Sequence, residues 1–133
     1  MTEYQHDRRL VSSGAAWETV VGYSRAVRVG PWVFVAGTTA AAVEGGAVGG
    51  DDVAAQTREA LRRIALALEQ AGARLHDVVR TRMFVTDIGR WEEVGRVHGE
   101  VFADIRPATS MVEVSRLIDP ALLIEIEADA YVS

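Results

Sequence analysis

The sequence predicts an α+β domain in which two helices cover one face of a mixed β-sheet. Six short runs have the composition or the two-residue apolar period of β-strands, and two longer runs have the 3.6-residue period of amphipathic helices. Three of the strands precede the first helix, one lies between the helices and two follow them. The length of 133 residues fits one domain with a sizeable core.

The first third of the chain predicts a short strand at residues 8–12 and a hairpin made of strands at 25–29 and 32–36. Gly30 and Pro31 join the two strands of the hairpin. Glycine at the first central position permits the positive φ of a type II′ turn, and proline is tolerated at the second.

A long amphipathic helix follows, capped by Asp51 or Asp52 and running to about Ala71, with Gly72 directly after its end. Its predicted apolar stripe consists of Val53, Thr57, Ala60, Leu61, Ile64, Ala65 and Leu68. A second helix spans about residues 90–103 and cannot continue through Pro107. Its predicted buried side holds Trp91, Val94, His98, Val101 and Phe102.

The remaining strands are predicted at residues 78–86, 109–115 and 122–132. The strand at 78–86 is expected to direct Val79, Thr81, Met83 and Val85 toward the helices. The strand at 122–132 is expected to direct Leu122, Ile124, Ile126, Ala128 and Ala130 toward them. The opposite face is then expected to display Arg80, Arg82, Phe84, Thr109, Met111, Glu113, Glu125, Glu127 and Asp129. A mixture of compensated charge and apolar groups on an uncovered sheet face fits an oligomer interface.

Composition narrows the classes of function. Apolar residues make up 49% and charged residues 25%, as in an ordinary globular protein. No apolar run approaches the roughly 20 residues of a membrane span, and no signal peptide is evident, so we expect a cytoplasmic protein without a membrane partner. Cysteine and lysine are absent, which excludes thiolate and lysine Schiff-base chemistry. The net charge of −5 argues against a nucleic-acid partner.

The three histidines, His6, His76 and His98, have no metal-ligand spacing, and we predict neither a metal nor a cofactor. His98 lies on the apolar stripe of the second helix, where a hydrogen-bonded core residue is the first interpretation. An acid–base role is the alternative, because imidazole titrates near neutrality.

Several blocks of the sequence, in the same order, resemble the Rid family of reactive intermediate deaminases, also called the YjgF/UK114 family. That family has Pro-Ala-Arg-Ser followed by Val-Glu-Val, and then Glu-Ile-Glu-Ala near its end. The corresponding segments here are Pro107-Ala108-Thr109-Ser110, Val112-Glu113-Val114 and Glu125-Ile126-Glu127-Ala128. Further family blocks resemble segments 22–27, 33–38, 71–79 and 84–87. The resemblance therefore implies that residues 1–133 form a single Rid-like domain.

The resemblance implies a chorismate-mutase-like fold, assembly as a homotrimer and a small-molecule ligand in a cleft between subunits. Rid enzymes hydrolyse short-lived enamines and imines to a 2-keto acid and ammonia. Glu125 matches the family glutamate that positions the attacking water and is the candidate catalytic residue; the alternative is an interface glutamate paired with Arg80 or Arg82. The candidate ligand-binding residues are Tyr23, Gly37, Thr38, Arg82, Phe84, Thr109 and Met111.

Thr109 is the main departure from the family, because it stands where the substrate-binding arginine belongs. Ala36, Gly95 and Met111 also depart from the family pattern. Arg82 is the candidate replacement cation, the alternative being a structural partner of Glu125 or Glu127. Arg106 could approach the cleft, although a solvated loop arginine is the first interpretation.

We therefore expect imine or enamine hydrolysis with altered specificity. A non-catalytic small-molecule-binding homologue is the alternative, and a ribonuclease or translation inhibitor ranks last because of the acidic charge.

Overall fold

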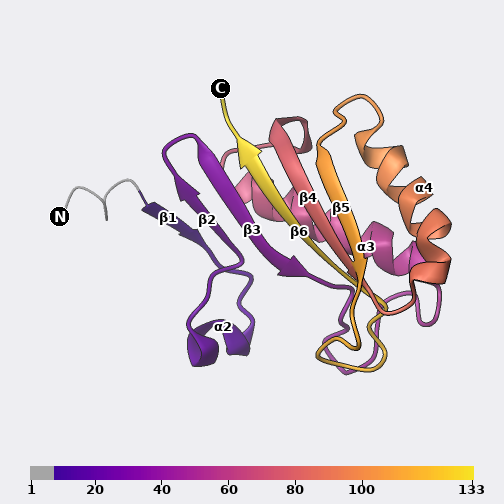
Figure 1. Cartoon of the computed structure of the whole chain (residues 1–133). Helices are drawn as coiled ribbons and strands as arrows, with labels where there is room; N and C mark the ends of the chain where they lie inside the picture. The colour runs from indigo at the N-terminus through magenta and orange to yellow at the C-terminus, as the bar shows by residue number, and fades with distance from the viewer. Residues whose placement is uncertain (1–7) are drawn as a thin grey trace.

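The computed structural model describes residues 8–133, in which six strands form one sheet in the order β1-β2-β3-β6-β4-β5 (Figure 1). The strands are β1 (Arg8–Val11), β2 (Ala26–Val29), β3 (Trp32–Thr38), β4 (Val78–Val85), β5 (Ala108–Glu113) and β6 (Ile124–Tyr131). Strands β4 and β5 are parallel and every other pair is antiparallel. The predicted mixed sheet is confirmed, and Gly30 in the β2–β3 turn has the expected positive φ of 56°.

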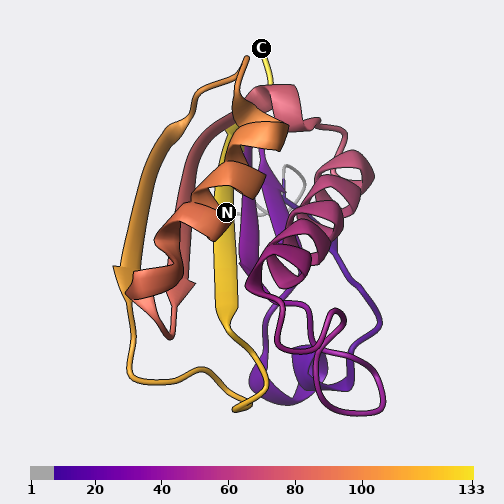
Figure 2. The ribbon, with the colours of Figure 1, turned by 90° about the vertical axis from the view of Figure 1, so that its right-hand side faces the viewer.

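Helices α3 (Val53–Gln70) and α4 (Trp91–Phe102) pack against each other over one face of this sheet (Figure 2). Asp52 caps α3 by accepting a hydrogen bond from the Ala55 amide, and Gly72 follows its end with a φ of 80°. The core lies between sheet and helices, and its largest fully buried side chains include Phe102, Leu61, Ile64, Leu68, Ile124 and Ile126. None of the helices in residues 8–133 is long and apolar enough to cross a membrane.

Two details of the predicted core are wrong. Val79 is exposed, and Val78 is buried in its place, because the pairing of β4 with β6 is irregular between Val78 and Arg80. On α4, Trp91 is 54% exposed, and the buried residues are Val94, Val97 and Phe102.

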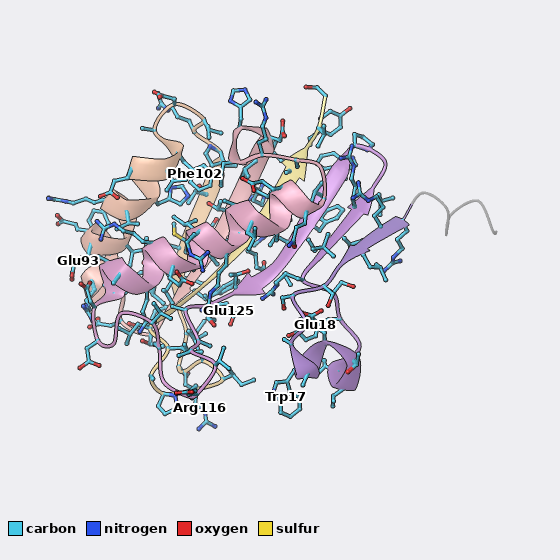
Figure 3. All side chains as sticks on the ribbon, turned by 180° about the vertical axis from the view of Figure 1, so that it is seen from behind. Trp17, Glu18, Glu93, Phe102, Arg116 and Glu125 are labelled. Atoms are coloured by element: carbon cyan, nitrogen blue, oxygen red, sulfur yellow. The ribbon has the colours of Figure 1, made fainter. Side chains whose placement is uncertain are left out.

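A short helix, α2 (Ala16–Val21), lies beside the β1–β3 end of the sheet and was not predicted (Figure 1). Its Glu18, labelled in Figure 3, is buried and accepts hydrogen bonds from the Ser13 amide and hydroxyl. Gly22 ends the helix with a φ of 88°. The helix thereby sets the start of the segment that carries Tyr23 and Arg25.

The amide of Gln56 is fully buried in α3 and ties two loops to the helix. Its Nε2 donates to the carbonyls of Gly50 (2.7 Å) and Ala121 (2.9 Å), and its Oε1 accepts from the Leu123 amide (2.9 Å). The second loop leads directly into β6, so this one side chain helps to fix where that strand begins.

We expect Gln56→Ala to lower the free energy of unfolding by at least about 2 kcal/mol, because each buried polar group left unpaired costs roughly 1–3 kcal/mol. Thr57→Val is the control. Within the described part of the chain the Thr57 hydroxyl donates only to the Val53 carbonyl of its own helix, and the loss of this bond should cost about 1 kcal/mol or less. Urea denaturation measures both, and equal effects would contradict the role given to Gln56.

Candidate functional site

The carboxylate of Glu125 lies directly over the backbone of Gly37 on the sheet face that the helices leave open. Gly37 falls in an irregular stretch of β3, where the register with β6 shifts between Val35 and Thr38. A Cβ added at Gly37 would collide with Glu125 Oε2 and would lie 2.9 Å from its Cδ. Any side chain at position 37 would displace the Glu125 carboxylate from this place, so these two predicted site residues form one unit.

Burial raises the pKa of Glu125, and the negative charge of Glu127 raises it further, while Arg25 partly opposes both effects. None of the ion pairs within residues 8–133 includes Glu125, so neither Arg80 nor Arg82 of the same chain is its partner. A half-buried carboxyl of this kind holds a proton to a higher pH than an ordinary glutamate. Such a group is suited to acid–base chemistry.

Phe84 and Arg25 neighbour Glu125, and Arg25 connects it to Tyr23. Phe84 lies directly opposite Glu125 in the β4–β6 register. Arg25 donates to the Gly37 carbonyl at 2.7 Å, and its guanidinium lies 6.0 Å from the centre of the Tyr23 ring. We call Tyr23, Arg25, Gly37, Phe84 and Glu125 the Glu125 cluster.

Arg25 is the residue of the Glu125 cluster that the sequence analysis missed. Among residues 8–133, its buried Nε has no hydrogen-bond partner, whereas its Nη2 donates to the Gly37 carbonyl. The signal was present in the sequence, because Arg25 lies two residues after Tyr23 within segment 22–27, one of the segments that resemble a family block.

Arg82, the candidate replacement cation, is engaged elsewhere. Its Nη1 lies 3.1 Å from Asp129 Oδ2 and 3.6 Å from Glu127 Oε1, and these acids come from the neighbouring strand β6. The structural alternative therefore describes Arg82, with Glu127 and Asp129 as its partners. Thr38 is also occupied, because its buried hydroxyl donates to the Ala36 carbonyl at 2.7 Å.

Thr109, Met111 and Glu113 do not lie on the open face, and their predicted placement is wrong. Strand β5 is aligned so that Thr109 lies beside Thr81 and Met111 beside Met83, both of which face the helices. Met111 packs against the core, and Glu113 accepts a hydrogen bond from the Ile88 amide. Thr109 and Glu125 therefore lie on opposite faces of the same chain.

His98 and Thr109 are joined by hydrogen bonds through Thr81, which is fully buried. Thr81 Oγ1 lies 2.9 Å from His98 Nε2 and 2.8 Å from Thr109 Oγ1, and Thr109 also donates to the Pro107 carbonyl at 3.2 Å. Burial lowers the pKa of His98, so the imidazole is neutral near pH 7. His98 is thus the hydrogen-bonded, partly buried residue of the first interpretation.

Two hollows lie near these groups. The larger, of about 690 Å³, is on the open face beside α2 and includes Tyr23, Phe34, Glu127 and Asp129 in its lining. The smaller, which we call the β5-edge hollow, has about 280 Å³ and is lined by His98, Gly99, Phe102, Ala103, Arg106, Pro107 and Thr109. The larger hollow shares Tyr23 with the Glu125 cluster, whereas the β5-edge hollow lies across the sheet.

Residues 8–133 contain no cluster of three or more histidine or acidic side chains suited to hold a metal ion. His6, one of the three histidines considered above, lies outside the described residues.

Comparison with known proteins gives a consistent result. A family model described as Endoribonuclease L-PSP matches residues 13–132. A RutC family protein of Pyrococcus abyssi is 39% identical over 124 residues, covering 93% of this chain and 97% of the relative. A Salmonella typhimurium relative named 2-iminobutanoate/2-iminopropanoate deaminase is 35% identical over 111 residues, covering 81% and 85%. A crystal structure from Mycobacterium tuberculosis, described as a YjgF/YER057c/UK114 family member, has a TM-score of 0.86 and 66% identity, covering 94% and 99%.

We expect Glu125→Gln to leave the protein at least as stable as the wild type at pH 7. Because the folded-state pKa of Glu125 is raised, ionising it costs stability as the pH rises above the ordinary glutamate value, and glutamine removes this cost. Glu59→Gln is the matched control. Arg62 and Arg63 lower the pKa of Glu59 to about 2. The ionised Glu59 therefore stabilises the protein at neutral pH, and this stabilisation is lost as the pH falls toward that value.

Thermal melts between pH 3 and pH 8 measure both variants. Marked destabilisation by Glu125→Gln at neutral pH would show that Glu125 is a structural charge partner.

Proposed function

Because the chain belongs to the YjgF/UK114 (Rid) family, we propose that it hydrolyses a small imine or enamine in a cleft between the subunits of a homotrimer. The observation that carries this proposal is the seating of the Glu125 carboxylate on Gly37, where it is half-buried and outside the ion pairs of the described residues. The name of the Salmonella relative supports the same substrate class.

The reaction that Glu125 could serve adds water across a C=N bond. A carboxylate can take a proton from water as the oxygen attacks the imine carbon, and the protonated acid can return it to the nitrogen. The carbinolamine then loses ammonia and leaves a ketone. A raised pKa assists both steps because it brings the exchange of the Glu125 proton closer to neutral pH. The Tyr23 hydroxyl is within the same cluster and could orient the substrate.

An intersubunit location is supported by the open face of the sheet. Trp32 stacks on Phe34 at a centroid distance of 6.2 Å and meets Tyr131 edge-on at 4.9 Å, yet all three rings are exposed. On the same face, Arg82 forms ion pairs with both Glu127 and Asp129. A face with exposed aromatic rings and internally paired charges is typical of an interface. Thr109, on the opposite face, could meet Glu125 only if it came from a neighbouring subunit.

Altered specificity follows from Thr109. A threonine hydroxyl has no charge with which to clamp a carboxylate, and this one is already hydrogen-bonded to Thr81 and Pro107. The same observation favours a second candidate, a Rid homologue that binds a small metabolite without turnover. Ribonuclease activity ranks below both, because the net charge is −5.

We expect wild-type protein to hydrolyse 2-iminopropanoate and 2-iminobutanoate slowly, because Thr109 offers no charge to their carboxylates. Glu125→Gln should reduce this rate by a further factor of about 100 or more, the usual range for a lost general acid–base. Glu100→Gln is the control, since Glu100 is an exposed residue of α4 that forms an ion pair with Arg58 of α3. An amino-acid oxidase or threonine dehydratase generates the imine, and semicarbazide trapping reports what remains. Full activity in Glu125→Gln would refute the assignment. If the wild type binds the product 2-oxobutanoate but does not hydrolyse the imine, the second candidate would be favoured.

We also expect sedimentation equilibrium at micromolar concentration to give three times the chain mass of 14.4 kDa. Phe34→Glu should dissociate the assembly, because it places a charge in the proposed interface. Leu66→Glu, at an equally exposed position on α3, should not (the two side chains are 45% and 47% exposed). A well-folded wild-type monomer would refute the trimer.

A further inference from the structure

The β5-edge hollow has the electrostatic character of an anion site. Arg106 supplies the only formal charge among its lining residues, and no carboxylate contributes to the lining. Phe102, labelled in Figure 3, and Pro107 provide apolar walls. A hollow of about 280 Å³ with one cation and apolar walls fits a small organic anion.

The backbone of Arg106 is unusual. Its φ is 57°, the only positive value at a residue other than glycine in the described part of the chain. The conformation closes the turn that follows α4, where the Arg106 amide donates to the Phe102 carbonyl at 2.8 Å. Helix ends of this type usually use glycine or asparagine, and the following Pro107 restricts Arg106 further. Strained residues of this kind cluster at functional sites, so the arginine side chain needs a reason other than backbone geometry.

The guanidinium of Arg106 is available to a ligand. Arg106 takes part in none of the ion pairs of residues 8–133, although Asp104 lies two residues earlier. Thr109 lines the same hollow and can redirect its proton from the Pro107 carbonyl, to which it makes a long bond of 3.2 Å. Thr81 would continue to donate to Thr109 Oγ1 while His98 Nε2–H donates to Thr81, so no buried group is left unpaired.

We propose that Arg106 anchors the carboxylate of the substrate in the β5-edge hollow, with the Thr109 hydroxyl as a second donor. This inference rests on the proposed function and names the cation that the reaction needs. It replaces Arg82, whose charge is engaged by Glu127 and Asp129 on the other face of the sheet. The arginine fork offers several donors to a carboxylate, and Thr109 adds one neutral hydrogen bond.

The test measures binding of 2-oxobutanoate by NMR titration of the ¹⁵N-labelled full-length protein. In the wild type we expect saturable shifts at His98, Thr109 and their neighbours. Arg106→Gly should weaken binding about ten- to a hundredfold, as for the loss of a charge-assisted hydrogen bond. Arg106→Lys should keep part of the affinity through its charge. Arg96→Gln, an exposed arginine of α4 outside the hollow, should bind as the wild type does.

Arg106→Gly also separates binding from folding. Glycine adopts a φ of 57° without strain, so the melting temperature should not fall even though affinity is lost. The uncharged 2-oxobutanamide should bind weakly to the wild type and should not distinguish it from Arg106→Gly.

Absence of saturable binding by the wild type, unchanged affinity in Arg106→Gly, or an equal loss in Arg96→Gln would overturn the proposal. The anchor and the proposed function can fail independently. If the protein turns over the imine with a KM that Arg106→Gly does not change, only the anchor is refuted. Arg106-dependent carboxylate binding without turnover leaves the anchor in place and refutes only the hydrolase.

Discussion

Strand β6 lies between β3 and β4, and its two-residue side-chain period determines what both faces of the sheet present. Ile124, Ile126, Ala128 and Ala130 are buried under the helices, while Glu125, Glu127 and Asp129 alternate with them on the open face. A slip of one residue would bury three acids and expose the core residues. The hydrophobic core therefore fixes the position of Glu125, and its chemistry depends on that placement.

The two groups of polar residues follow from this sheet. On the open face, the irregular stretch of β3 places Gly37 beneath Glu125, and the neighbouring Glu127 is held by Arg82. On the helix side, parallel pairing of β5 with β4 places Thr109 beside Thr81, within reach of His98. A site that uses both groups has to be completed by a second subunit. In this account, Glu125 acts on the substrate and Arg106 holds its carboxylate.

Much of the fold and the central part of the site could be predicted from the sequence, because they depend on local patterns. The strict alternation of β6 gave the correct face for Glu125, and Asp52 and Gly72 marked the ends of α3. The face of Thr109 was wrong because β5 has no such alternation. Its register depends on long-range pairing with β4. Val79 was misplaced for a similar reason, since an irregular pairing cannot be recognised from its own strand. The partners of Arg82 and the strain at Arg106 required coordinates.

The proposed chemistry depends most on the carboxyl of Glu125 holding its proton to a higher pH than an ordinary glutamate. A ¹³C NMR titration of the side-chain carboxyl of Glu125 measures this directly. We predict a midpoint above the ordinary glutamate value, moving down in Glu127→Gln, which removes a neighbouring negative charge, and up in Arg25→Gln, which removes the opposing positive charge. A wild-type midpoint at or below the ordinary value would contradict the account, because Glu125 would then be a solvated surface carboxylate.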